Sequence, residues 1–198
     1  MNKTKRKIFE TSMKLFSEKG YEATSVEEIT AVVGIAKGTL YHHFSSKEEI
    51  FNYLIDEGMK LLQNSVEIKI AKLDKVTDKL RAVVLIQTKV LFKYNNLISI
   101  VSSEIWGNST RNLKCQKSVM DYISFVEKIA QQGIDNNEFP NKNARLIACN
   151  IFSIFCSAQI YQMMSNNNFD VIYFYKEFEK VLLSSLFNER KVDKNGKN

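Results

Sequence analysis

The side chains best suited to bind another molecule are concentrated between positions 37 and 47. They are Lys37, Thr39, Tyr41, His42, His43 and Lys47. Ammonium, hydroxyl, phenol and imidazole groups donate hydrogen bonds to phosphate oxygens and to the polar edges of nucleic-acid bases. The sequence offers no phosphate-binding glycine loop, no paired-glycine nucleotide motif and no cysteine–histidine metal spacing. These patterns favour binding over catalysis, so we do not expect an enzyme.

The two histidines do not predict a metal site. His42 and His43 are adjacent, so on a helix their imidazoles point apart, and the sequence contains no other histidine. Zinc sites need at least three protein ligands that converge on the ion. We therefore expect neither a metal nor another cofactor.

A helix and a sharp turn are predicted immediately before these side chains. Ser25 stands three residues before Glu28, which is the spacing of a capping box at the start of a helix. Apolar residues then recur at helical spacing up to Val33. Gly34 follows at the position where a helix ends in a left-handed conformation, which glycine adopts without strain.

A second short helix is predicted over residues 37–43, with Leu40 and Phe44 directed inward. Ser46 and Glu49 repeat the capping pattern and predict a further helix from residue 47. Two short helices joined by a glycine turn are typical of a helix-turn-helix, whose second helix lies in the major groove of DNA.

Contact roles follow from positions on this second helix. Lys37, Thr39 and His42 lie on its outward side and are candidates for contacts with base edges, and His43 suits either bases or phosphates. Gly38 has no side chain, so the backbone could approach DNA closely there.

Phosphate contacts are predicted for Tyr41 and Lys47, and for Thr24 and Ser25 at the start of the first helix of the motif. The dipole at that helix start also favours an anion. Tyr41 has an alternative interpretation as a half-buried core aromatic.

The motif resembles that of the TetR family of bacterial transcriptional regulators. The matching residues are Phe16, Gly20, Tyr21, Thr24, Val26, Ile29, Gly34, Lys37, Gly38, Thr39, Tyr41, Phe44, Lys47 and Glu48. Two positions depart from the family pattern. Thr30 replaces the usual alanine, and Ala36 replaces the serine that caps the second helix, a loss that typically costs about 1 kcal/mol. The resemblance implies a homodimeric repressor that a small-molecule effector releases from a palindromic DNA operator.

Composition predicts an all-α fold of about nine helices. One proline and seven glycines among 198 residues leave long uninterrupted segments, and no alternating strand pattern occurs. We expect a helix-turn-helix domain at residues 1–46, a helical effector-binding and dimerisation domain at 47–188 and a polar tail at 189–198. Residues 1–47 carry eight lysines or arginines against five glutamates, which suits a phosphate-binding surface.

Two features predict a cytoplasmic protein. No apolar run of a secretory signal follows the basic N-terminal residues. The three cysteines, Cys115, Cys149 and Cys156, are expected to be reduced, buried thiols. Cys149 and Cys156 lie seven residues apart on one predicted helix face, which leaves a redox switch as an alternative.

The uncharged residues 146–169 are long enough to span a bilayer. Scattered serine, asparagine and glutamine residues argue against that, so we expect no membrane contact and a helix packed between its own subunit and a second one. The last helix carries a stripe at Val171, Phe174, Phe178, Val181, Leu182 and Ser185. By pattern alone this stripe could equally be intramolecular core. In the resembled family the last two helices pair as a four-helix bundle, so we expect a homodimer through them.

The resemblance also implies an effector pocket among the predicted fourth to eighth helices. Candidate lining residues are Phe92, Glu104, Trp106, Tyr122, Phe125 and Phe152. The aromatic residues suit a hydrophobic effector but are usually core at such spacing. Glu104 interrupts an apolar side and must be paired, exposed or used, so it would favour a cationic or hydrogen-bonding effector if it faces the pocket. An ordinary surface glutamate is the competing interpretation.

One alternative function stays open at this point. The second domain could dock a protein partner in place of a small molecule, while the helix-turn-helix still binds DNA.

Overall fold

The computed structural model describes residues 3–139, 143–165 and 170–187. All regular secondary structure in these ranges is helical, as the sequence predicts. The elements are α1 (Lys3–Lys19), α2 (Val26–Val33), α3 (Lys37–His43), α4 (Lys47–Ile70), α5 (Val76–Lys93), α6 (Asn95–Glu104), α7 (Thr110–Asp135), α8 (Ala144–Phe152), α9 (Ile154–Met164) and α10 (Val171–Phe187). The predicted eighth helix is divided at Ser153 into α8 and α9. The predicted tail at 189–198 and the side chain of Ser185 lie outside the described residues.

The described residues pack as two compact units. Unit 1 contains residues 3–65 and 90–122, and unit 2 contains residues 66–89 and the described part of 123–198. Helices α4, α5 and α7 each contribute to both units. The predicted domain boundary after residue 46 is a functional division, and it stays a prediction.

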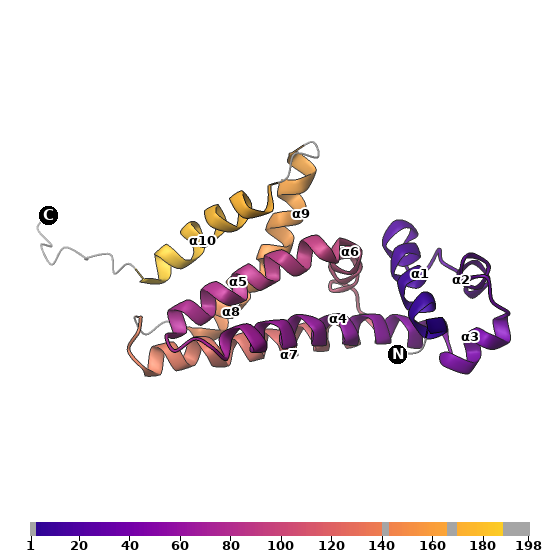
Figure 1. Ribbon diagram of the computed structural model, residues 1–198, viewed down its shortest axis with the longest axis horizontal. Coiled ribbons are helices and arrows are strands. Elements are labelled where there is room, and N and C mark those ends of the chain that lie inside the picture. Colours follow the sequence, from indigo (N-terminus) through magenta and orange to yellow (C-terminus); the bar gives the residue numbers. More distant parts are fainter. Residues whose placement is uncertain (1–2, 140–142, 166–169, 188–198) are drawn as a thin grey trace, which may run out of the picture. The chain divides into compact units, whose positions relative to one another are not determined.

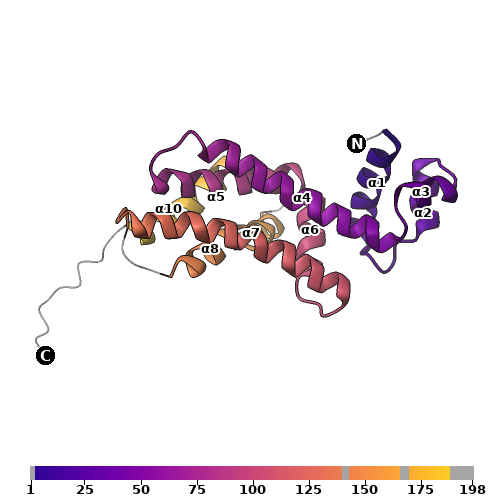
Figure 2. The same cartoon turned by 90° about the horizontal axis from the view of Figure 1, so that it is seen from below.

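Unit 1 is built around α1, which packs against α2, α3 and α6. Figures 1 and 2 show α1, α2 and α3 gathered beside the beginning of α4. Ile8, Ile29, Leu40 and Phe51 come from four of these helices, and each is 0% exposed. Full burial of such a side chain stabilises the fold by roughly 1.5–3 kcal/mol. The helices that carry the predicted DNA contacts therefore share one apolar core.

Unit 2 is held by contacts between residues far apart in the sequence. Glu138 accepts hydrogen bonds from the backbone N–H groups of Val76, at 3.0 Å, and Thr77, at 3.1 Å, and so caps the start of α5. Arg81 of α5 pairs with Glu179 of α10 at 3.0 Å. These contacts tie α5 to two separate parts of the second half of the chain.

Gly133 lies inside α7, which continues to Asp135. The residue has a packing role. A Cβ built at Gly133 would lie 2.2 Å from the ring carbon Cε1 of Phe139. The left-handed turn comes later, at Asn137, with φ of 55°.

The cysteine environments differ from the expectation of three buried thiols. Cys115 is buried, and burial raises the pKa of its thiol to about 12. Cys149 and Cys156 are exposed, so the prediction is wrong for these two. All three are free thiols in the described chain, and the redox switch stays an untested alternative.

Residues 144–164 are long and apolar enough to cross a membrane by length and composition. Only 33% of the most apolar window is buried. Core helices of soluble proteins have the same length and composition. The prediction that a second subunit covers part of this segment would account for its apolar exposed side.

The turn at Gly34 provides a stability test. Its φ is +75°, and a Cβ added there meets nothing within 4 Å, so only backbone strain opposes a side chain. Gly34→Ala should lower the free energy of unfolding by about 1–2 kcal/mol, measured by urea denaturation. Gly38→Ala is the matched control, because Gly38 lies inside α3 with equally open space, and it should raise stability by roughly 0.5–1 kcal/mol. Equal effects at the two positions would contradict the assigned role of the Gly34 turn.

Candidate nucleic-acid interface

Helix α3 is an exposed rod with a single buried side chain. Leu40 is 0% exposed and fixes the helix to the core of unit 1. The exposed residues are Lys37, Gly38, Thr39, Tyr41 and His42, and His43 is half-buried. Tyr41 is 45% exposed, which favours the surface role over the core alternative. The predicted base-contacting side chains are therefore all accessible on one short helix.

The turn before α3 forms as the sequence predicts. Gly34 has the left-handed conformation, and its N–H donates to the Thr30 carbonyl at 2.9 Å. The N–H of Ile35 donates to the same carbonyl at 3.1 Å. Ala36 begins α3 without a side-chain cap. The two hydrogen bonds to Thr30 close the end of α2, and at the start of α3 the Thr39 N–H donates to the Ala36 backbone carbonyl at 2.9 Å.

Ser25 caps α2 by accepting a hydrogen bond from the Glu28 N–H at 3.0 Å. The Glu28 carboxylate pairs with Lys19 and does not reach back to Ser25, so only half of the predicted capping box forms. Ser25 itself is exposed at the start of α2, where N–H groups can face an anion.

Thr24 has a structural position. It is 1% exposed, and its hydroxyl donates to the Gly20 carbonyl at 2.9 Å. Its N–H donates to the Tyr21 carbonyl at 3.3 Å. Because both donors serve the α1–α2 turn, we assign Thr24 to that turn and not to the phosphate contact that the sequence suggests.

Lys47 closes the same turn from the beginning of α4. Its ammonium donates to the carbonyls of Tyr21 and Thr24, at 2.9 Å each, and lies 4.1 Å from the centre of the Tyr21 ring. An ammonium carries three donors, so a phosphate contact would use the third. The structural role of Lys47 is therefore compatible with the predicted phosphate contact.

Lys37, the first residue of α3, is paired with a carboxylate of α2. Its ammonium forms an exposed ion pair with Glu27 of α2. The hydrogen bond from Lys37 lowers the pKa of the Glu27 carboxyl below its ordinary value. A base acceptor must therefore share this ammonium with a carboxylate or replace that carboxylate.

The two histidine rings do not point apart as expected, because their centroids lie 5.2 Å from each other in an edge-to-face contact. Among the described residues, no three side chains of metal-binding type are grouped. His42 is exposed and His43 half-buried, so both imidazoles can be reached from outside the unit.

The candidate effector-lining residues differ in their exposure and in the unit to which they belong. Trp106 is 84% exposed, so among the described residues it does not line an enclosed pocket, and the prediction for this residue is wrong. Glu104 is 8% exposed and bonded to Arg111 at 3.0 Å, so it is neither a pocket carboxylate nor a surface glutamate. The three candidate phenylalanines are each half-buried, Phe92 in unit 1 and Phe125 and Phe152 in unit 2.

Tyr122 borders a cavity in unit 1. The cavity has a volume of about 200 Å³, and Tyr122 is 1% exposed. The other lining residues are Asp56, Met59, Lys60, Gln63, Ser118 and Asp121. Charged and polar side chains predominate among them, so this cavity differs from the aromatic pocket that the sequence suggests.

The sequence analysis did not single out Arg111, although it named Glu104 and Tyr21, two of the residues that Arg111 contacts. Arg111 bonds Glu104 and Glu22, and its guanidinium lies 3.8 Å from the centre of the Tyr21 ring. No local pattern marks this arginine, because Glu22 is 89 positions away.

The position of Lys47 predicts a stability effect. Lys47→Ala should lower the free energy of unfolding by about 1.5–3 kcal/mol, because two carbonyls lose a charged donor. Lys60→Ala is the control in the same helix, where the lysine is 68% exposed and pairs with Glu57. Urea denaturation should show a change within about 0.5 kcal/mol for the control. An unchanged stability for Lys47→Ala would contradict the structural role assigned to this lysine.

The helix-turn-helix of this chain matches a known family. Residues 8–54 fit the family model described as bacterial regulatory proteins, tetR family. The chain is 30% identical over 148 residues to an uncharacterized HTH-type transcriptional regulator, YfiR of Bacillus subtilis strain 168, covering 70% of this chain and 69% of the relative.

Two solved structures share the fold. A putative fatty acid metabolism regulator of Clostridium perfringens has a TM-score of 0.85 and 28% identity, covering 92% of this chain and 100% of that chain. The transcriptional regulator FadR of Bacillus subtilis, in complex with stearoyl-CoA, has a TM-score of 0.79 and 22% identity, covering 91% of this chain and 98% of that chain. With the exposed α3 and the matching helix-turn-helix, these findings show that the chain belongs to the tetR family of bacterial transcriptional regulators.

Proposed function

We propose that this chain is a cytoplasmic transcriptional repressor that binds a palindromic operator as a homodimer and is released by a hydrophobic small-molecule effector. The observation that carries the DNA-binding part is the exposure of α3, in which only Leu40 is buried. The relative that is 30% identical over 148 residues is itself named a transcriptional regulator, and no enzyme activity is proposed.

The proposed base contacts come from Lys37, Thr39 and His42. A lysine pairs best with guanine acceptors, and a threonine methyl group suits thymine. Gly38 lets the backbone approach, and His43 completes the surface.

The proposed phosphate contacts come from Ser25, Tyr41 and Lys47. Ser25 lies at the start of α2, Tyr41 lies on α3, and Lys47 lies at the start of α4. Because phosphate contacts carry no sequence information directly, these residues would set the position of α3 on the duplex.

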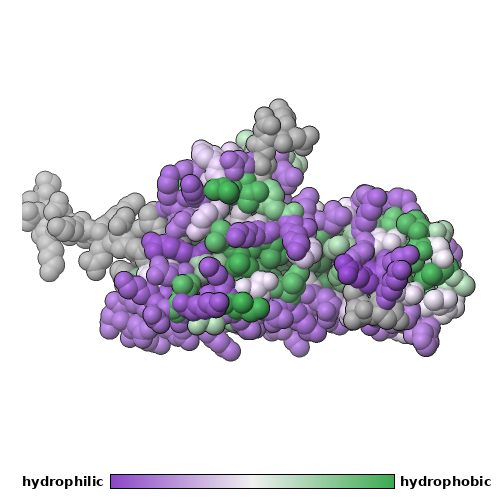
Figure 3. Space-filling view, viewed as in Figure 1, coloured by the Kyte–Doolittle hydropathy of each residue, from purple (hydrophilic) through white to green (hydrophobic). Residues whose placement is uncertain are grey.

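The proposed dimer surface lies in unit 2, on α9 and α10. Exposed apolar side chains there are Ile160, Met163, Met164, Ile172, Tyr173 and Val181. Figure 3 shows hydrophobic surface over these helices. Of the predicted stripe, Phe174 is 7% exposed and so packs inside its own unit, whereas Val181 is 77% exposed. An apolar patch of this kind marks an interaction surface, and two-fold pairing would double a recognition helix that alone contacts few bases.

The effector is proposed to be hydrophobic, with a long-chain fatty acyl-CoA as the first candidate. A solved structure similar to this chain is named a putative fatty acid metabolism regulator, and one with the same fold contains stearoyl-CoA. The cationic alternative loses its support, because Arg111 and Asn112 occupy the Glu104 carboxylate.

The first step in testing this proposal is to identify the operator sequence. Genomic fragments bound by the protein should yield a palindrome with half-sites about one helical turn apart, or a multiple of that distance. The protein should sediment as a dimer at micromolar concentration.

Stearoyl-CoA should then lower operator affinity by about 5- to 150-fold, the range of typical allosteric coupling. Coenzyme A alone and stearic acid alone are the controls in the same fluorescence-anisotropy assay. Failure to select any duplex would refute the proposed DNA-binding function. Operator binding whose affinity is unchanged by all three compounds would refute only the acyl-CoA assignment.

A further inference from the structure

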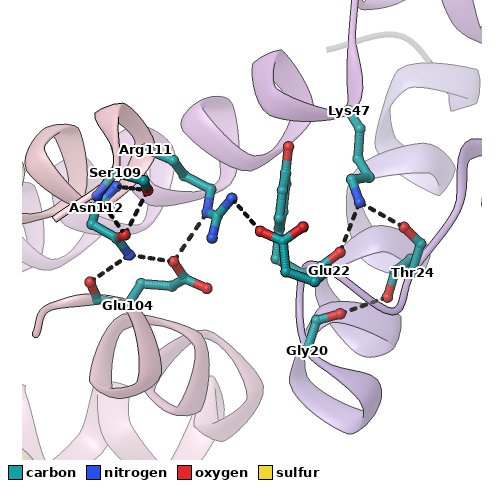
Figure 4. Close-up of polar contacts among 9 residues, drawn as sticks. Gly20, Glu22, Thr24, Lys47, Glu104, Ser109, Arg111 and Asn112 are labelled. Atoms are coloured by element: carbon teal, nitrogen blue, oxygen red, sulfur yellow. Dashed lines mark hydrogen bonds and ion pairs between the residues drawn. The ribbon is translucent and has the colours of Figure 1, made fainter. Parts of the chain in front are cut away.

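Arg111, at the beginning of α7, binds two carboxylates from separate parts of unit 1. Its Nε donates to Glu104 Oε2 at 3.0 Å, and its Nη1 donates to Glu22 Oε1 at 3.0 Å. Figure 4 shows the guanidinium between these two groups. Glu104 ends α6, and Glu22 lies in the α1–α2 turn of the helix-turn-helix. One side chain thus joins the α6–α7 junction to the DNA-binding helices.

The Tyr21 ring adds a second link to the same turn. The Arg111 guanidinium carbon lies 3.8 Å from the ring centre, and the Lys47 ammonium lies 4.1 Å from it. The ring also packs against Phe51 of α4, at 5.3 Å between centroids. Cations over an aromatic face are attracted to it, so the turn is held from both α4 and α7.

The far end of this linkage is anchored in a buried polar cluster. Asn112 Nδ2 donates to the Glu104 carboxylate at 2.6 Å and to the Glu104 backbone carbonyl at 2.8 Å. Glu104 and Asn112 are each 8% exposed. Asn112 Oδ1 in turn accepts from the Ser109 N–H at 3.0 Å, which closes the turn between α6 and α7 (Figure 4).

Close packing prevents this junction from adjusting freely. Gln116 Nε2 donates to the carbonyls of Ile105, at 2.9 Å, and Gly107, at 2.8 Å. A Cβ at Gly107 would lie 2.3 Å from Asn112 Oδ1. A displacement of α6 or of the start of α7 would therefore move Arg111 as well.

We propose that Arg111 is a positioning residue for operator binding, which couples the α6–α7 junction to the α1–α2 turn and hence to α2 and α3. The inference rests on the proposed DNA-binding function and adds a residue that does not itself contact DNA. Because α1 also packs directly against α6, Arg111 acts where the DNA-binding helices already meet the rest of unit 1.

The chemistry requires arginine. A guanidinium presents several donors in a rigid plane, so it can bind two carboxylates and lie on an aromatic ring at once, which a lysine cannot do. Burial disfavours its charged form, yet the hydrogen bonds and charges of Glu104 and Glu22 outweigh burial and raise the pKa of Arg111. The Glu22 side chain is 81% exposed, so solvent screens its ion pair with Arg111. The Glu104 side chain is 11% exposed, so its ion pair with Arg111 is screened less.

The test uses a double variant of the full chain, Arg111→Gln with Glu104→Gln. One positive and one negative charge are removed together, so the net charge and long-range attraction to DNA are preserved, and no buried carboxylate is left unpaired. The matched control is Arg145→Gln with Glu127→Gln, which removes a 3.2 Å arginine–glutamate pair from unit 2. Arg111→Lys serves as a conservative single variant.

Affinity is measured for the selected operator duplex and for a random duplex of equal length. The Arg111/Glu104 double variant should bind the operator at least about fivefold more weakly and the random duplex about equally well. The control should change neither, and Arg111→Lys should fall between wild type and the double variant. A folded double variant with wild-type operator affinity would overturn the proposal.

Hydrogen exchange separates coupling from mere stability. Coupling is reciprocal, so operator DNA should slow amide exchange at residues 105–113 of the wild type, which do not touch DNA in this proposal. That protection should vanish in the double variant, or in Arg111→Lys if the double variant does not fold. Persistence of the protection in Arg111→Lys at wild-type strength would also overturn the proposal. Absence of any wild-type DNA binding would instead refute the proposed function.

Discussion

An isolated helix of seven residues is not stable in water, so the DNA-binding surface depends on the contacts by which the rest of unit 1 stabilises α3. Helix α3 has no side-chain cap at its start and buries only Leu40. Its conformation is imposed by the left-handed turn at Gly34 and by the apolar core that Leu40 and Phe44 enter. The same arrangement leaves the remaining faces of α3 accessible, so the stability of the helix and the exposure of its reading side chains have one cause.

The polar side chains around this core have two roles, exposure on α3 and stabilisation of the α1–α2 turn. Lys37, Thr39 and His42 are exposed on α3, whereas Thr24, Lys47 and Arg111 are committed to the α1–α2 turn. The turn is thus tied to α4 through Lys47 and to the α6–α7 junction through Arg111 (Figure 4). A regulator needs such ties, because an effector bound elsewhere must change the position of its recognition helix.

Much of the fold could be predicted from local signals. The Ser25 cap and the Gly34 stop set the bounds of α2, and the predicted helix at 37–43 and helix start at 47 match α3 and α4. Tertiary contacts decided what local signals could not. Glu104 was predicted as a pocket or surface residue, but its partner Arg111 reaches it only because the chain turns between α6 and α7. Gly133 lies inside α7, and its spacing in the sequence does not reveal that the Phe139 ring packs where a side chain would otherwise lie.

The most direct test of the account is a methylation-interference footprint of the selected operator. If α3 enters the major groove, methylation of guanine N7 should block binding at two symmetric half-sites about 34 Å apart or a multiple of that distance. Interference restricted to the minor groove, or no protected duplex at any salt concentration, would contradict the central claim that α3 reads DNA.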